Sequence, residues 1–521
     1  MQELIEEAIL RKAKAVLRSQ RIERATQLKN ADRYEKRTGI VGGTPPISDP
    51  AWWTYHPHFD PRYCIKHARY LSRVIWRHLG NNTYSPVPAI QFDVPKPDGT
   101  SRKIMAFAIP DSAVANVVHR NATRRNINLF SAYSFAYRRD KTVFDAILHL
   151  NRSLGGPKSY IIQYDFSKYF DSIDHGYLRK ILFNKELFLL PEAERFAIDA
   201  FLNHEYAHVT TYQAGGFEVR DEGVPQGSSL SLFLSNAASH ELDLVLERQN
   251  GTFVRFADDV VAVTHSYADA LAVAERFRIH CEAAGLSINY EKSPGILLFG
   301  GSPGREKRDF VVDTDDGALL ETVDSVDYLG HRLTPEGVCL PTKSVKRIKA
   351  HISELIYKHL FLHRRGPTGA FNAARVGPGF FDWDLVTCLN EVRRYMYGGL
   401  REAQLRAFLE DDIKPPFVRG LMAFFPLTTN VRQLSELDGW LLSVFRRAQR
   451  ERVRMLHGLG HAVPRLRKQE ILSGSWYNYP AIANDATLPS FVRAWRAARK
   501  YYLRYGLAQI RPPSYYSLMS Y

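Results

Sequence analysis

Apolar and polar positions recur with different periods along the chain, and these periods separate a mixed region from a helical one. Residues 1–37 have apolar residues at helical spacing, and residues 38–61 are interrupted by Gly and Pro, typical of an irregular connection. From Val94, short strand-like runs alternate with helical stretches until about residue 341, after which the pattern is helical. The sequence predicts an α+β fold with an N-terminal helical extension and linker (1–60), a sheet-containing domain (61–340) and a basic helical region (341–521).

Two of the short apolar runs end in carboxylates. Asp165 closes YIIQYD, while Asp258 and Asp259 interrupt FVRFADDVVAV between runs that favour buried strands. Adjacent like charges in apolar surroundings repel unless a cation or an arginine offsets them. One interpretation is a surface hairpin whose tip carries two solvated aspartates. The other is a site for two divalent cations, because carboxylates at neighbouring strand ends, together with substrate phosphates, suit Mg²⁺.

Basic residues are concentrated in the last third of the chain. The net charge is +15, yet residues 341–521 contain 29 Lys and Arg against 13 Asp and Glu, so the rest is almost neutral. Segments such as EVRRYMYGG, FRRAQRERVR and VRAWRAARKYYLRY place basic residues beside aromatic and aliphatic ones at helical spacing. The pattern indicates either solvated helix faces or a surface for the phosphate backbone of nucleic acid, and the one-sided distribution favours the second.

The remaining composition narrows the class of protein. Four scattered cysteines without a CxxC pairing predict neither a disulfide framework nor a cysteine zinc site, and they fit a reducing compartment. His457 and His461 lack further ligands at metal spacing. The first residues are acidic where a secretory signal is basic, and no uninterrupted apolar run has the length of a membrane span. We therefore expect a cytoplasmic protein without a membrane contact.

Six segments between about residues 90 and 340 resemble, in order, the motifs of reverse transcriptases. They are PKPDGTSRK of the fingers, the first aspartate motif YDFSKYFDSI, the template- and nucleotide-handling EGVPQGSSLSLFLSN, the second aspartate motif FADD, the next motif GLSINYEKS, and DYLG of the primer grip. Each motif alone is a weak signal, and their shared order makes the resemblance specific. It implies a right-hand polymerase with fingers and palm, followed by an all-helical thumb and C-terminal region.

The resemblance also implies roles for individual residues. Asp165 and Asp258 would ligate two Mg²⁺ ions, with Mn²⁺ as an alternative, and Asp259 would support them. Arg102 would contact the triphosphate through its planar fork. The primer grip would comprise Tyr328, Leu329 and Gly330, and the implied nucleotide-binding positions are Lys96, Arg102, Lys103, Phe166, Phe170, Gln226 and Gly227.

Two positions carry open alternatives, and a third departs from the family pattern. Lys292 stands where a lysine is proposed to protonate the leaving pyrophosphate, and its alternative is a solvated loop lysine. Phe170, five residues after Asp165, would exclude a ribose 2′-hydroxyl by steric overlap. The competing interpretation makes Phe170 a core aromatic and assigns the gate to Tyr169 or to no residue. Phe256 departs from the tyrosine most often found in the family, which removes a hydroxyl near the primer but leaves the metal chemistry intact.

The implied activity is RNA-directed DNA polymerisation, with an RNA template, deoxynucleotides and a DNA product as partners. No VTG-type thumb motif or clustered endonuclease cysteines are present, and the long basic helical C-terminal segment resembles abortive-infection and defence-associated bacterial reverse transcriptases. This implies anti-phage defence, with a dedicated non-coding RNA as a candidate partner. Alternatives are an intron-like or retron-like reverse transcriptase, a template-independent DNA polymerase, an RNA-dependent RNA polymerase and an inactive nucleic-acid-binding protein. Oligomeric state and priming, including priming on a tyrosine of residues 502–521, stay open.

Overall fold

The computed structural model describes residues 1–40, 48–96, 99–155, 159–184, 187–300, 310–311, 319–362, 364–365, 370–371, 373, 375–377, 381–477 and 486–510. It divides into two compact units, 1–25 with 46–324 and 26–45 with 325–521. The fold is mixed α+β, as predicted. The predicted domain boundaries at 60 and 340 stay predictions. The predicted turn residues Pro97 and Asp98 and the tail tyrosines beyond residue 510 lie outside the described residues.

The first unit is built on a six-stranded sheet in which β3 is central. The strand order is β12-β9-β3-β7-β6, and β8 pairs with the end of β3. β3 is antiparallel to β7, β8 and β9, and β6 and β7 form a hairpin. The strands are β3 Ser159–Ser167, β6 Thr252–Phe256, β7 Asp259–Thr264, β8 Ser287–Ile288, β9 Gly295–Phe299 and β12 Thr322–Val323.

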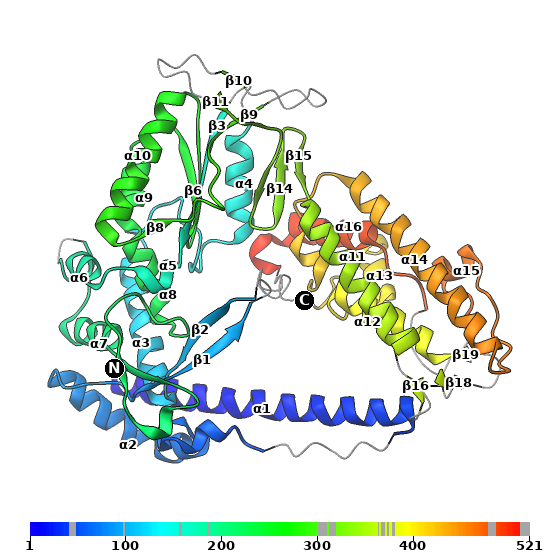
Figure 1. The fold of residues 1–521 in the computed structure, drawn as a ribbon, viewed down its shortest axis with the longest axis horizontal. Coiled ribbons are helices and arrows are strands. Elements are labelled where there is room, and N and C mark those ends of the chain that lie inside the picture. Colours follow the sequence, from blue (N-terminus) through cyan, green and yellow to red (C-terminus); the bar gives the residue numbers. More distant parts are fainter. Residues whose placement is uncertain are drawn as a thin grey trace. The chain divides into compact units, whose positions relative to one another are not determined.

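The alternation of side chains along β3 assigns its two faces. Tyr160, Ile162, Tyr164 and Phe166 belong to the main core, on the side covered by α10 (Tyr267–Ala284), where the ring of Phe277 lies 4.7 Å from that of Tyr164. α10 runs along this sheet in Figure 1. Since successive residues of a strand point to opposite faces, Asp165 points away from α10.

A second sheet and a set of helices complete the first unit. The sheet order is β2-β1-β4-β5, with β1 Ala89–Pro95, β2 Ser101–Ala106, β4 Glu205–His208 and β5 Glu218–Val219. The short strands β10 Phe310–Val311 and β11 Leu319–Leu320 pair with each other. The helices are α1 Gln2–Thr38, whose second part belongs to the other unit, α2 Pro61–Gly80, α3 Ile109–Asn126, α4 Val143–Ser153, α5 Tyr169–Ser172, α6 His175–Phe183, α7 Glu192–Leu202, α8 Leu230–Ala238 and α9 His240–Leu246.

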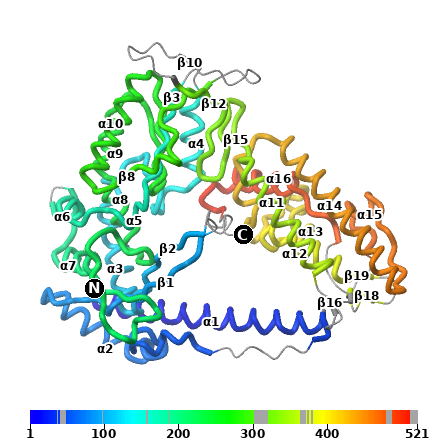
Figure 2. Tube along the Cα trace, in the orientation of Figure 1, coloured from blue at the N-terminus to red at the C-terminus, as the bar shows by residue number. Residues whose placement is uncertain are grey.

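The second unit is mainly helical. A three-stranded meander precedes its helices, with β13 Val326–Tyr328, β14 His331–Thr334 and β15 Gly337–Cys339. Among the helices, α14 and α13 both pack against α16, and α11 packs against α12 (Figure 2). The helices are α11 Thr342–Tyr357, α12 Trp383–Tyr397, α13 Glu402–Glu410, α14 Val431–His457, α15 Lys468–Ser473 and α16 Phe491–Tyr505.

One feature of the second unit differs from the all-helical expectation. Two small hairpins separate α11 from α12, namely β16 Arg364–Arg365 with β17 Ala370–Phe371 and β18 Val376–Gly377 with β19 Phe381–Asp382. Gly and Pro are frequent in this segment and interrupt helices, which explains the break. Across the described ranges, no helix combines the length and the apolarity needed to cross a membrane.

Candidate active site

The sheet brings the three predicted aspartates to one end. Asp165 of β3 and Asp259 of β7 are direct Cα partners, so their side chains share the face opposite α10. Asp258 and Ala257 form the two-residue turn of the β6–β7 hairpin, in which Phe256 pairs with Asp259. The hairpin of the first interpretation is therefore present, but Asp258 and Asp259 are both half-buried rather than solvated at an exposed tip.

Burial and the charges of neighbouring carboxylates raise the pKa values of Asp258 and Asp259. Burial raises the pKa of Asp259 to about 8, the charges of Asp258 and Asp165 add to the rise, and a hydrogen bond with Gln163 opposes it. Burial also raises the pKa of Asp258, Asp165 adds to the rise, and the charges of Arg102 and Lys292 oppose it. Asp258 and Asp259 therefore ionise less readily than ordinary carboxyls, and additional positive charge would favour their ionised forms.

The donor chemistry of this cluster fits a hard divalent cation. Within the described ranges, no three His, Cys, Asp or Glu side chains stand in the arrangement of a preformed metal site. Mg²⁺ is usually held by one or two carboxylates, and water and substrate phosphates complete its shell. Asp165 and Asp258 supply such a pair of oxygen donors, and a bound cation would lower the pKa values that repulsion raises.

The end of β3 is fixed by the segment that follows β8. The Asp165 amide donates to Ser293 Oγ at 3.0 Å, and the Asn289 amide donates to the Asp165 carbonyl at 2.8 Å. This places Lys292 Nζ 3.4 Å from Asp165 Oδ2, with 69% of the lysine side chain exposed. The lysine lies beside a predicted metal ligand and is largely exposed, which fits both of its interpretations, so its catalytic role stays a prediction.

The glycine-containing loop after β5 is docked on the turn that follows Asp165. The Val224 amide donates to the Phe170 carbonyl at 2.6 Å, and Gln226 Nε2 donates to Asp171 Oδ2 at 2.9 Å. Gly223 has φ +70°, and a Cβ there would lie 2.6 Å from backbone atoms of Phe170 and Asp171. Only glycine fits such a close approach in the left-handed region. The loop and the Asp165 turn thus form one packed unit.

The same loop is joined to β2. The Met105 amide donates to the Gln226 carbonyl at 2.7 Å. Gly227 has φ +117°, and a Cβ at this position would lie 2.4 Å from the Met105 carbonyl oxygen. The structure therefore supplies a packing reason for Gly227 that sequence reasoning did not include. The predicted approach of Gln226 and Gly227 to a nascent base pair stays a prediction.

The three predicted basic contacts on the β1–β2 hairpin are not equivalent. Arg102 is half-buried, and its charge acts on Asp258. Lys103 is the next residue of β2, so its exposed side chain points to the other face of the strand. Lys96 is exposed beside the turn, where its amide donates to the Thr100 carbonyl at 2.7 Å. Arg102 is the member of this group that the structure relates to the carboxylates.

The aromatic residues after Asp165 have separate positions. Tyr169 is 2% exposed and its hydroxyl donates to the Ser235 carbonyl at 2.6 Å, so it is a core residue and not a gate. Phe166 is 3% exposed and stacks on Tyr169 with ring centroids 5.3 Å apart. Its side chain packs in the core, and the predicted nucleotide contact of Phe166 stays a prediction. Phe170 is half-buried and lies edge-on to Tyr137, so it keeps an accessible side.

The predicted primer-grip residues form a hairpin turn in the second unit. Tyr328 and His331 are Cα partners, and Leu329 and Gly330 between them have φ +46° and +74°. Two positive φ values are typical of the tight turns that join antiparallel strands. Tyr328 is 1% exposed, so its side chain belongs to the core of that unit. The role of this turn in holding a primer stays a prediction.

Sequence reasoning missed the buried network behind the FADD turn. Arg255 is fully buried and forms a bidentate ion pair with Asp243, with N–O distances of 2.7 and 2.6 Å. Its Nη1 atom also donates to Asn236 Oδ1 at 3.1 Å and to the Ala257 carbonyl at 3.2 Å, and Nη2 donates to Ser134 Oγ. The signal was available, because an arginine within the apolar run FVRFA requires a buried acidic partner.

Comparisons with known proteins find a family model that matches the part of the chain containing these residues. Residues 94–333 match the family described as reverse transcriptase (RNA-dependent DNA polymerase). Protein YkfC of Escherichia coli (strain K12) is 28% identical over 181 residues, which are 34% of this chain and 45% of YkfC. The chain thus matches less than half the length of this curated relative.

Solved telomerase structures are also similar to the chain. Apo telomerase from Candida tropicalis has a TM-score of 0.38 and 12% identity, covering 81% of this chain and 78% of that one. Telomerase from Candida albicans in complex with a TWJ fragment of telomeric RNA has a TM-score of 0.37 and 12% identity, covering 80% and 67%. The family match spans β2, β3, the FADD hairpin and the β13–β14 turn. Residues 94–333, somewhat less than half of the chain, are therefore similar to the reverse transcriptase family.

Proposed function

We propose that this protein synthesises DNA on an RNA template by nucleotidyl transfer at Asp165 and Asp258. The observation that carries the proposal is the pairing of Asp165 with Asp259 across β3 and β7, with Asp258 in the adjoining turn, inside the reverse transcriptase match. Three carboxyl groups lie together at this end of the sheet, and the raised pKa values of Asp258 and Asp259 mean that a bound cation would favour their charged forms. Such a site is suited to cations that accompany a triphosphate.

Each residue of the site would have a separate role in the reaction. Asp165 and Asp258 would hold the divalent ions, Mg²⁺ or Mn²⁺, and Asp259 would add negative charge beside them. When bound, the ions supply Lewis-acid activation of the attacking hydroxyl and of the leaving phosphate. Arg102 would bind triphosphate oxygens through its planar fork, and Lys292 would stand near the pyrophosphate as a proton donor. Gln226, held by Asp171, would fix the loop beside the new base pair.

Substitution of the paired carboxylates tests this assignment. Asp165→Asn and Asp258→Asn keep the side-chain shape but remove the charge, so kcat should fall by on the order of a thousandfold or more while RNA binding persists. A matched control is Asp199→Asn, which removes a surface carboxylate of α7 that pairs with Arg179 at 2.7 Å. Substantial DNA synthesis by either site variant would refute the assignment.

Template dependence separates the remaining polymerase alternatives. Purified protein should extend a primer on RNA with deoxynucleotides, and the product should be complementary to the template. Products without a template relationship would identify a template-independent polymerase, and incorporation of ribonucleotides would identify an RNA polymerase. Sequencing the copurified RNA would show whether the template is a dedicated non-coding RNA, an intron or a retron-like RNA.

We also propose an anti-phage role, supported by the resemblance of the basic helical C-terminal segment to defence-associated reverse transcriptases. In a bacterial host carrying the gene, phage plating should fall with the wild-type protein and recover with Asp165→Asn at equal expression. Equal plating on both strains would remove this proposal without affecting the polymerase assignment. The cytoplasmic location and the oligomeric state remain expectations that fractionation and light scattering can measure.

A further inference from the structure

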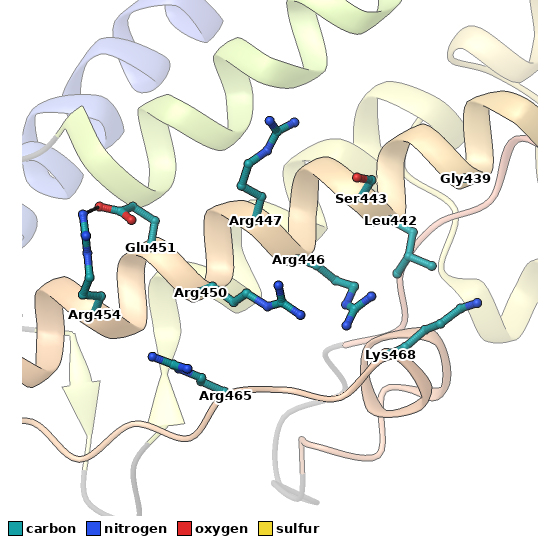
Figure 3. Close-up of a pocket in the computed structure, with 10 residues that line it drawn as sticks. All are labelled: Gly439, Leu442, Ser443, Arg446, Arg447, Arg450, Glu451, Arg454, Arg465 and Lys468. Atoms are coloured by element: carbon teal, nitrogen blue, oxygen red, sulfur yellow. Dashed lines mark hydrogen bonds and ion pairs between the residues drawn. The ribbon is translucent and has the colours of Figure 1, made fainter.

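Helix α14 lines a strongly basic pocket in the second unit. The pocket has a volume of about 730 Å³ and lies between α14 and the chain around residues 465–468. Figure 3 shows Arg446 and Arg450 of α14 on the side that faces this segment, to which Lys468 belongs. Arg447 projects to the other side of α14. Its cationic lining residues are Arg446, Arg447, Arg450, Arg454, Arg465 and Lys468.

The positive charge of this pocket is poorly compensated from within the chain. One acidic residue, Glu451, lines it, and this carboxylate pairs with Arg454 one helical turn away (Figure 3). In the part of the chain that the structure describes, the other five cations have no ion-pair partner. The Nε atom of Arg446 is moreover buried without a hydrogen-bond partner. Clustered like charges repel, and a buried unpaired donor costs free energy, so the pocket is built to receive an anion.

Other basic residues of the same unit are paired internally. Arg452, also on α14, is 2% exposed and donates to both carboxylate oxygens of Asp382 and to Asp384. On α16, Arg493 pairs with Glu402, and Lys500 and Arg504 pair with Asp412. Part of the basic character of the C-terminal sequence is therefore used in internal ion pairs. The pocket cations are a cluster that is not used in this way.

We propose that the pocket binds the phosphate groups of a nucleic-acid strand, the RNA template or the DNA product. Guanidinium groups match phosphate oxygens with two parallel hydrogen bonds, and several converging arginines favour a polyanion over a single carboxylate. The proposal rests on the proposed function, because it takes its ligand from the polymerase reaction. The sequence predicted a nucleic-acid surface for the whole basic C-terminal region, and the proposal narrows this surface to one pocket. Arg452 is not part of that pocket.

A charge-matched comparison tests the pocket. The pocket variant is Arg446→Gln/Arg450→Gln/Arg465→Gln. The control variant is Arg278→Gln/Arg394→Gln/Arg432→Gln, which removes the same charge from exposed helical arginines that each pair with a nearby glutamate. Both are checked by circular dichroism and thermal unfolding. Binding of a labelled single-stranded RNA is then measured between about 50 and 200 mM salt.

We expect the pocket variant alone to lose affinity, with a salt slope that falls by roughly 0.7 for each lost phosphate contact on a single strand. Two RNAs, one with a 5′-hydroxyl end and one with a 5′-monophosphate end, show whether the pocket binds internal phosphates or a terminal phosphate. A loss of affinity for either RNA in the pocket variant supports the proposal. An unchanged slope, an equal loss in the control variant, or a loss confined to free deoxynucleotides or to anionic lipid vesicles would overturn it.

The polymerase assay keeps this proposal separate from the proposed function. If the wild-type protein makes no DNA but binds RNA through the pocket, the polymerase assignment fails and the pocket assignment stands. If the protein makes DNA and the pocket variant binds RNA like the control, the pocket assignment fails alone. The Asp165→Asn variant adds a second check, since it should lose synthesis and retain the full salt slope of RNA binding.

Discussion

Asp243→Asn should destabilise the first unit strongly, because it leaves Arg255 as a buried charge without its partner. Both side chains of the pair are 0% exposed, and two hydrogen bonds join them. Removing one partner of a buried pair costs about 3–5 kcal/mol. The free energy of unfolding of a domain is typically only about 5–15 kcal/mol, so this single amide would remove a large part of it.

A double-mutant cycle isolates the pair from its surroundings. Arg255→Met should cost a similar amount, because it leaves Asp243 buried and removes the donors to Asn236 and Ala257. The double variant Arg255→Met/Asp243→Asn contains neither charge. Its cost should therefore be smaller than the sum of the two single costs by at least about 2 kcal/mol. Urea unfolding followed by circular dichroism measures all three variants against wild type.

Measurements at the FADD turn distinguish the loss of this pair from a general packing defect. Arg255 donates to the carbonyl of Ala257, which has φ +62° in the FADD turn, so its loss should speed hydrogen exchange in the β6–β7 hairpin and lower kcat. Asp199→Asn breaks a surface ion pair and should change stability by less than about 1 kcal/mol. Additive single costs, or single costs below about 1 kcal/mol, would refute the reasoning.

Three further outcomes are expected. Phe170→Val should lower the ratio of kcat/KM for deoxynucleotides over ribonucleotides tenfold or more, about 1.4 kcal/mol, whereas Tyr169→Phe should leave the ratio unchanged, as steady-state kinetics can show. Burial raises the pKa of Asp111 to about 7. This group should therefore make the wild-type protein less stable as pH rises from about 4 to 7, by up to about 4 kcal/mol. Asp111→Asn should remove this pH dependence from the midpoints of urea unfolding. Gly223→Ala should reduce DNA synthesis and stability more than Gly215→Ala, which has a similar φ of +77° but open space at the Cβ position.

The sequence was sufficient for the parts of the site that depend on local pattern. The apolar runs ending at Asp165 and Asp258 predicted two strands, and these are β3, which contains Asp165 near its end, and β6, which ends just before the turn with Asp258. The alternation of strand-like and helical runs was enough to predict the α+β fold class. Short range signals work here because strand alternation and turn chemistry are set by a few neighbouring residues.

Features that depend on tertiary packing were not predictable in the same way. Phe166 is buried under Phe277 of α10, and Tyr169 is buried against α8, which no local pattern specifies. The positive φ of Gly227 and its contact with Met105 join segments more than a hundred residues apart. Likewise, the basic run FRRAQRERVR does not show which arginines are internal, and only the contacts of Arg452 separate it from its neighbours.

The two kinds of arginine in this chain should respond differently to salt. Pairs that are buried, such as Arg452 with Asp382 and Arg255 with Asp243, are shielded from mobile ions and should change little in strength. Binding of a strand by the pocket arginines releases the counterions of that strand, so added salt weakens this binding. For three phosphate contacts on a single strand, RNA affinity should fall roughly 20-fold between about 50 and 200 mM salt. Thermal unfolding of the free protein over the same range should shift little, because the folded-state pairs persist. A melting temperature that changes as steeply as the affinity would mean that the arginines of α14 stabilise the fold rather than bind a strand.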